Sequence, residues 1–215
     1  MIQSGKFDSP IMNIKKIANN ASNFVIQRLI EFLGLVIVIL GILLFLSLAT
    51  YSPEDPNFIF PDNTKIKNIL GYQGSFLSDL FFQSLGLISY LIPITLIFTG
   101  INIFRYKEIL LLIDNLFYAV IYSLVGTIFF NQFSNNAFDL YINGNGGFVG
   151  VYLNNTILNS LIILNENITF YLLLIIIFIF FLISLNLNFK GLLSFYKKIF
   201  SFITKSKDKN YTNKN

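Results

Sequence analysis

The stretch that decides the fold is residues 32–49, which read FLGLVIVILGILLFLSLA without a charged side chain. As a helix these 18 residues would cover roughly 27 Å, close to the roughly 30 Å hydrocarbon thickness of a bilayer. About thirty polar or mixed residues precede the run, and Tyr51-Ser52-Pro53-Glu54 follows it, so it does not read as a removed signal peptide. We therefore expect a retained membrane-spanning helix.

Three further apolar runs follow, and the composition agrees with a lipid environment. The chain is 54% hydrophobic and 12% charged, whereas soluble domains carry about 25% charged residues. The third run contains Asp114, but near its start, where a carboxylate can still reach the membrane interface. We predict an all-α membrane protein with a four-helix membrane domain at residues 28–190. The predicted spans are about 32–50, 80–104, 109–130 and 169–188.

Basic residues predict the orientation, because Lys and Arg near the ends of spans are retained on the cytoplasmic side. Thirteen of the 15 basic residues lie before the first span, between the second and third, or after the fourth. We therefore expect both termini in the cytoplasm. Residues 1–27 would form a cytoplasmic N-terminal tail, and residues 191–215 a basic tail or the start of a linker.

The two loops on the opposite side differ in character. Residues 51–76 begin with two prolines, Pro53 and Pro56, that stop the first helix. The second loop passes through Gly144-Asn145-Gly146-Gly147 into a mostly apolar stretch, residues 148–164. Its apolar residues share one helical face, which predicts an amphipathic periplasmic segment lying on the outer leaflet; a re-entrant hairpin is the alternative. That face contains Phe148, Val151, Tyr152, Leu158, Leu161 and Ile162.

The sequence offers little for catalysis. It contains neither cysteine nor histidine, which removes the usual zinc ligands and the commonest general base. Gly71 and Gly74 are not followed by Gly-Lys-Ser/Thr, so they do not form a phosphate-binding loop, and we expect them to shape a turn. We predict no enzyme activity, catalytic residue, cofactor or metal. The basic clusters suit anionic lipid better than nucleic acid, so we expect no direct nucleic-acid binding.

Two carboxylates raise the question of transport. Asp79 shares a helix face with Gln83, Gly86 and Tyr90, and Asp114 shares one with Tyr118 and Tyr122. A polar stripe with a carboxylate can form an ion path, but these two would lie near opposite membrane faces, about 25 Å apart by helical rise. We favour helix–helix contacts for both stripes. Aligned glycines on the first span, Gly34 and Gly41, would allow close helix approach.

The loop motifs carry a family resemblance. Residues 48–58, LATYSPEDPNF, and 68–80, NILGYQGSFLSDL, followed by 86–93, GLISYLIP, resemble the four-helix membrane domain of the FtsK/SpoIIIE DNA translocases. Residues 146–150, GGFVG, resemble the family's glycine-rich entry to its outer amphipathic segment. The likeness covers about residues 28–190. The residues that carry it are Tyr51, Pro53, Asp55, Pro56, Asn68, Gly71, Gly74, Asp79, Pro93, Gly146, Gly147 and Gly150.

This resemblance implies a role in cell division and chromosome segregation. The domain would anchor a DNA translocase in the bacterial inner membrane at the division septum, form a homo-oligomer and contact other cell-division membrane proteins. The family's ATPase and DNA-reading domains have no counterpart in these residues. The sequence leaves open whether the chain is a fragment, the product of a split gene or a free-standing anchor. A small four-helix transporter or channel is the alternative function.

Overall fold

The computed structural model describes residues 10–56, 65–134, 143–156 and 166–187, with side chains described from residue 19 onward. Within these ranges every regular element is a helix, and four stretches are long and apolar enough to cross a membrane. The expected all-α class with four candidate spans is therefore confirmed. The elements are α1 (Pro10–Ala49), α2 (Gly71–Leu85), the 3₁₀ helix η1 (Gly86–Tyr90), α3 (Leu91–Tyr106), α4 (Leu110–Phe133), α5 (Gly147–Thr156) and α6 (Glu166–Ser184).

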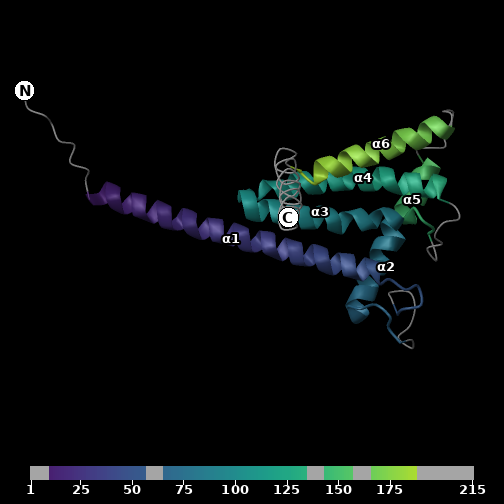
Figure 1. Ribbon diagram of the computed structural model, residues 1–215, viewed down its shortest axis with the longest axis horizontal. Coiled ribbons are helices and arrows are strands. Elements are labelled where there is room, and N and C mark those ends of the chain that lie inside the picture. The colour runs from purple at the N-terminus through teal and green to yellow at the C-terminus, as the bar shows by residue number, and fades with distance from the viewer. Residues whose placement is uncertain (1–9, 57–64, 135–142, 157–165, 188–215) are drawn as a thin grey trace, which may run out of the picture. The chain divides into compact units, whose positions relative to one another are not determined.

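The long helices pack in two pairs: α1 lies along α3, and α4 lies along α6 (Figure 1). On α1 the buried residues recur every three or four positions, which places them on one face. That seam consists of Gly34, Ile37, Gly41, Leu44 and Leu48. The remaining faces of α1 are largely exposed. A single helix face is thus enough to hold α1 against the rest of the molecule.

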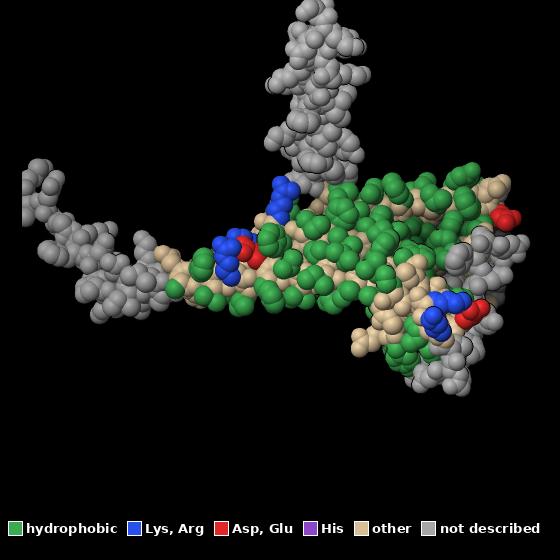
Figure 2. All heavy atoms as spheres, turned by 60° about the horizontal axis from the view of Figure 1, so that its bottom comes forward, with side chains coloured by type: hydrophobic (Ala, Val, Ile, Leu, Met, Phe, Trp, Pro, Cys, Tyr) green, Lys and Arg blue, Asp and Glu red, His purple; other side chains and the backbone are tan. Residues whose placement is uncertain are grey.

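The exposed surface of the long helices is apolar. Figure 2 shows hydrophobic side chains covering them, with charged side chains gathered toward the two ends. Phe32 is 65% exposed, Leu110 67% and Tyr171 64%, although large apolar side chains in water are normally buried. The buried positions instead hold many small and polar residues, as is typical of helix packing in lipid. The surface therefore fits a bilayer.

The second span is not one continuous helix. We expected a run at residues 80–104, but the helical segment begins at Gly71 and changes course at Gly86, where φ is 72°. Such a φ is easily adopted only by glycine. The 3₁₀ turn η1 then leads into α3. Figure 1 shows α2 turned across the end of α1, whereas α3 runs beside it.

The first helix also begins earlier than its apolar run, at Pro10 instead of near residue 32. Residues from Asn186 onward form a second unit, of which only Asn186 and Leu187 are described. The basic tail at residues 191–215 therefore lies outside the described residues. So do Leu158, Leu161 and Ile162 of the expected amphipathic segment.

Candidate functional site

The loop after α1 folds back onto α2, and together they form a unit that we call the cap, residues 47–56 and 65–79. At its centre lies Asp55, whose side chain is almost completely buried. The Asp55 carboxylate accepts hydrogen bonds from the backbone N–H groups of Lys67 and Asn68, both at 2.8 Å. A buried carboxylate is stabilised by such donors. Asp55 thereby ties the two ends of the loop together.

Asn68 extends this network to both helices. Its Nδ2 donates to the carbonyl of Ser47 on α1 at 2.9 Å, and its Oδ1 accepts from the N–H of Leu70 at 3.1 Å. A Cβ on Gly74 would lie 2.2 Å from Asn68 Oδ1, so only glycine fits there. Ser47 Oγ donates to the Gly74 carbonyl at 2.6 Å. The end of α1 is therefore fastened directly to α2.

The two glycines expected to shape a turn have different places. Gly71 ends a turn, with φ of 66° and its N–H bonded to the Asn68 carbonyl at 2.9 Å. Gly74 lies inside α2, so for Gly74 the turn expectation was wrong. Beside it, Ser75 Oγ donates to the Pro56 carbonyl at 2.8 Å. Pro53, nearby in the same loop, is half-buried.

Asp79 is held at the other side of the cap. Its Oδ1 lies 3.3 Å from the hydroxyl of Tyr51 and 3.4 Å from Gln83 Nε2, one helical turn away. The Tyr51 ring packs on Phe82 with centroids 4.8 Å apart. Burial and the nearby Asp79 carboxylate raise the pKa of Tyr51 above its usual value. The phenol therefore keeps its proton and donates a hydrogen bond to the carboxylate.

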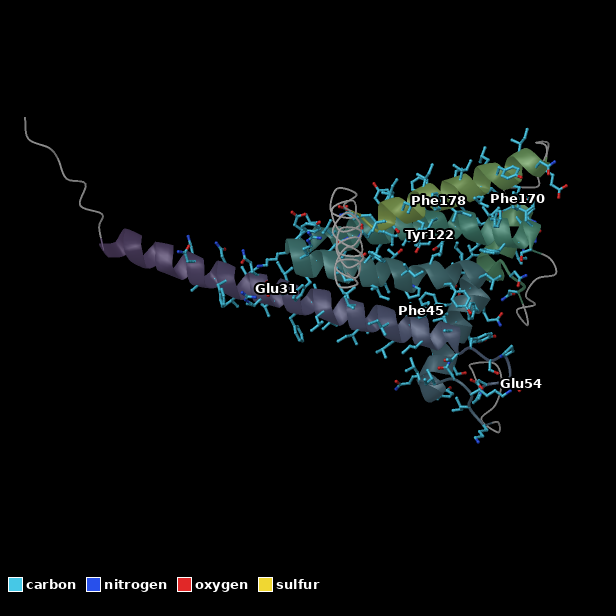
Figure 3. The ribbon with its side chains drawn as sticks, viewed as in Figure 1. Glu31, Phe45, Glu54, Tyr122, Phe170 and Phe178 are labelled. Atoms are coloured by element: carbon cyan, nitrogen blue, oxygen red, sulfur yellow. The ribbon has the colours of Figure 1, made fainter. Side chains whose placement is uncertain are left out.

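The rim of the cap carries an exposed ion pair between Glu54 and Lys67. The lysine lowers the pKa of Glu54, and the carboxylate raises the pKa of Lys67. Figure 3 places Glu54 beyond the end of α1, well separated from Glu31 on the same helix. Exposed pairs of this kind add little stability.

A second junction joins α2, α4 and α5 through glycines. The carbonyl of Asn145 accepts the Leu87 N–H at 2.9 Å, and a Cβ on Gly86 would lie 2.0 Å from that carbonyl oxygen. Cβ atoms on Gly146 or Gly150 would each lie 2.5 Å from the Thr127 carbonyl oxygen of α4. Gly147 has φ of 64° and meets the backbone of residues 84–86. These glycines allow backbone to pack against backbone.

Glycines between α1 and α3 also allow the two backbones to pack closely. A Cβ on Gly34 would lie 2.8 Å from the Gly100 carbonyl oxygen, and one on Gly41 would lie 3.1 Å from that of Pro93. At one end of this pair, Lys107 Nζ lies 2.9 Å from Glu31, which also pairs with Arg28. Gly34 and Gly41 therefore pack against α3 of the same chain.

The face predicted on the third span is only partly buried. Tyr122 is fully buried, and its hydroxyl lies 3.0 Å from Thr95 Oγ1, which lies 3.0 Å from Ser184 Oγ. Tyr118 stacks on Phe180 of α6 with centroids 6.1 Å apart. Asp114 is exposed. The structure thus brings Asp79, Gln83 and Tyr51 together but does not bring Asp114 to them.

Several polar residues of these contacts were not singled out from the sequence. Most of them are isolated polar residues in an apolar run, and such a residue in a span is itself a signal for helix packing. Asn115 Nδ2, for example, donates to Thr99 Oγ1 at 2.9 Å. The missed residues are Ser47, Thr95, Thr99, Asn102, Asn115, Asn145 and Ser184.

No group of three Asp, Glu, His or Cys side chains close enough to hold a metal occurs within the described part of the chain. The arrangement is that of a polytopic α-helical membrane protein whose loops are fastened to its spans. Residues 27–197 match the family described as the 4TM region of DNA translocase FtsK/SpoIIIE. The chain belongs to this family, and it is a multi-pass protein of the inner membrane.

Curated relatives agree with the family. The chain is 25% identical to the DNA translocase FtsK of Rickettsia prowazekii over 80% of its own length and 22% of the relative's. It is 34% identical to the Caulobacter vibrioides protein over 34% of its length and 9% of the relative's. With the Shewanella oneidensis protein it shares 29% identity over 58% of its length and 14% of the relative's. The chain thus spans about a fifth or less of these relatives. No solved structure matches it.

Proposed function

We propose that this chain is the non-enzymatic membrane anchor of an FtsK-like DNA translocase acting in cell division and chromosome segregation. In this role it forms a homo-oligomer, sits at the division septum and contacts other cell-division membrane proteins. It does not bind nucleic acid itself. The match of residues 27–197 to the family's membrane region carries the proposal.

The contacts of the polar residues support an anchor over a small transporter. An ion path needs polar groups that are continuous across the membrane and free to exchange partners. Here Thr95 bonds to both Tyr122 and Ser184, and Asn115 bonds to Thr99. Asp79 is engaged by Tyr51 in the cap, away from the exposed Asp114. These side chains hold helices together.

The proposed topology has both termini in the cytoplasm and the cap in the periplasm. Arg28 and Lys107 lie at one end of the α1–α3 pair, where both contact Glu31, and basic residues favour the cytoplasmic side. On α5, Phe148 and Tyr152 are 60% and 59% exposed, while Gly147 and Gly150 are buried. That exposed aromatic face supports the proposal that this segment is amphipathic and lies on the outer leaflet.

A fluorescent fusion of the chain, expressed at its native level in its own bacterium, tests the division role. We expect enrichment at mid-cell in dividing cells, and an even distribution around the envelope would contradict it. The double variant Asp79→Asn and Asp114→Asn distinguishes an anchor from a transporter. It should still reach the septum, because an anchor needs no titrating carboxylate.

Purified chain in proteoliposomes tests the alternative. We expect no proton or solute flux above that of protein-free vesicles. Flux that appears with the wild type and disappears with the double variant would establish a transporter and overturn the proposal.

Topology can be tested separately, because the chain contains no cysteine and a single introduced one is a unique label. In intact cells with a permeable outer membrane, an impermeant maleimide should label Glu54→Cys but not Arg105→Cys. The reverse pattern would invert the proposed orientation.

A further inference from the structure

The helix α2 has its polar and apolar sides arranged in the reverse of what a helix in water needs. One face carries Gly74, Ser75, Ser78, Asp79 and Phe82, and all five are buried. The opposite face carries an apolar stripe, spaced three or four residues apart, that stays exposed. That stripe consists of Ile69 just before the helix, then Tyr72, Phe76 and Leu80, with exposed fractions of 67%, 48%, 37% and 52%.

The buried face of α2 is fixed by the cap. Ser75 donates to the Pro56 carbonyl, the Gly74 carbonyl accepts from Ser47, and Asp79 accepts from Tyr51. Because this side is held by several hydrogen bonds, α2 cannot roll to hide its apolar stripe. The stripe therefore faces whatever surrounds the protein.

The helix α2 packs against α1, which also exposes apolar side chains. α2 lies across the end of α1 (Figure 1), and the last turns of α1 expose Ile42, Leu43 and Phe45, by 45%, 40% and 40%. Figure 3 labels Phe45 on this part of α1. The charged pair Glu54 and Lys67 belongs to the cap loop, whose Pro56 contacts the buried face of α2 at Ser75. Apolar surface on one side and charge on the other is the arrangement of a helix at a membrane interface.

We propose that α2 is an interfacial helix that inserts Ile69, Tyr72, Phe76 and Leu80 into the boundary between headgroups and acyl chains, in the leaflet on the cap side. Tyr72 suits that depth, because its ring is apolar and its hydroxyl polar. A second copy of the chain is a poorer occupant. A stable protein interface buries about 800 Å² per partner and involves 20 to 30 residues a side, whereas this stripe is one side chain wide.

The chain contains no tryptophan, so a single introduced one reports on its own surroundings. The test uses full-length Phe76→Trp and Leu80→Trp variants in vesicles of phosphatidylethanolamine and phosphatidylglycerol. Lipids brominated at different acyl positions quench from within the bilayer, and iodide on both sides quenches from water. Glu54→Trp is the matched control, because its side chain lies on the cap and is 72% exposed.

We expect both stripe variants to emit at shorter wavelength than Glu54→Trp and to lose intensity with brominated lipid. The loss should be greatest for bromines nearest the headgroups, and iodide should quench only the control. Two variants on one face keep the test valid if either fails to fold.

Two results would overturn the proposal. Iodide quenching of Phe76→Trp and Leu80→Trp as strong as that of the control would place the stripe in water. Protection from both iodide and brominated lipid, lost when the protein is diluted with lipid, would place the stripe against a second copy of the chain.

Discussion

The two helix pairs of the membrane domain are held together in opposite ways. Between α1 and α3, backbone meets backbone at Gly34 and Gly100, and no side chain separates the helices there. Between α4 and α6, large rings fill the space: Tyr122 packs on Phe181, and Phe129 on Phe170. Figure 3 labels Phe170 and Phe178 on α6 and Tyr122 on α4. The first contact is made by backbone and the second by large side chains.

A groove of about 610 Å³ lies beside these rings, among η1, α4 and α6. Its lining is almost entirely apolar and includes Leu91, Phe130, Leu174, Ile177, Phe178 and Phe181. Close backbone contact allows no added atom, whereas side chains around a groove can rearrange. The α1–α3 pair should therefore be intolerant of substitution and the α4–α6 pair tolerant.

The largest effect should come from Gly100→Val. A Cβ at residue 100 would lie 2.6 Å from the Gly34 carbonyl oxygen, and backbone cannot move aside as a side chain can. We expect a loss of about 3 kcal/mol, at the upper end of overpacking effects, measured by denaturant titration of the detergent-solubilised chain. Leu40→Ala on the exposed side of α1 is the control and should change stability by less than about 0.5 kcal/mol. Equal effects of the two would refute the backbone contact.

The next effect should come from Asp55→Ala, which loosens the cap at the end of the α1–α3 pair. It leaves the N–H groups of Lys67 and Asn68 without their acceptor, and for the buried Asn68 N–H such a loss costs about 1–3 kcal/mol. We expect a loss of about 2 kcal/mol in the same titration. Glu54→Ala, one residue earlier but exposed, should have little effect. A silent Asp55→Ala would show that the cap is not needed for stability.

Two matched substitutions that enlarge an isoleucine side chain test whether the two helix pairs differ in tolerance. Ile37→Phe adds volume to the α1 seam, where Ile37 is 6% exposed, and should destabilise by about 2 kcal/mol. Ile177→Phe adds the same atoms beside the groove and should change stability by less than about 1 kcal/mol in either direction. The same loss from both would mean that the two pairs do not differ in tolerance.

A smaller effect is expected from Tyr122→Phe, which removes the hydroxyl that bonds to Thr95. Thr95 keeps Ser184 as a partner at 3.0 Å, and hydrogen bonds between membrane helices average about 0.6 kcal/mol. A loss near 0.6 kcal/mol is therefore expected. A loss as large as that of Gly100→Val would show that hydroxyl contacts, and not shape, dominate the bundle.

The smallest effect concerns the exposed Glu54–Lys67 pair. Because Lys67 lowers the pKa of Glu54, the pair's contribution is present above the usual value of 4.5 and is lost as the pH falls through the lowered pKa. Because Glu54 raises the pKa of Lys67, the contribution persists until the pH rises through that raised value. Unfolding midpoints of wild type and Glu54→Gln should differ slightly at pH 7 and converge in acid.

The long apolar runs made four candidate spans predictable, because hydropathy is a local property of the chain. The bend at Gly86 was not predictable in this way. Gly86 stands between Leu85 and Leu87 in an uncharged run, and the atom that excludes a side chain there is the Asn145 carbonyl oxygen, distant in sequence. The same holds for Gly74, whose neighbour Asn68 Oδ1 reaches it only after the cap has folded.

The cap residues marked by the family resemblance could be listed from the sequence, but their contacts could not. Asp55 and Asn68 are separated by residues of ordinary loop composition, and only the folded loop brings the carboxylate to two backbone donors. Asp114, Tyr118 and Tyr122 all lie in α4 at four-residue spacing. Helix packing then buried Tyr122 and left Asp114 exposed, because the contact stripe on α4 runs through Asn115 and Ala119.

The length of α1 has a mechanical consequence. Its contact with Lys107 through Glu31 marks the end of α3, yet α1 begins at Pro10, so roughly twenty residues of continuous helix, about 30 Å at 1.5 Å per residue, extend past that point. A sideways load on this extending part of α1, which we call the arm, would pivot α1 about the Gly34–Gly100 contact. The backbone contact between Gly34 and Gly100 is thus also where a load on the arm would act first.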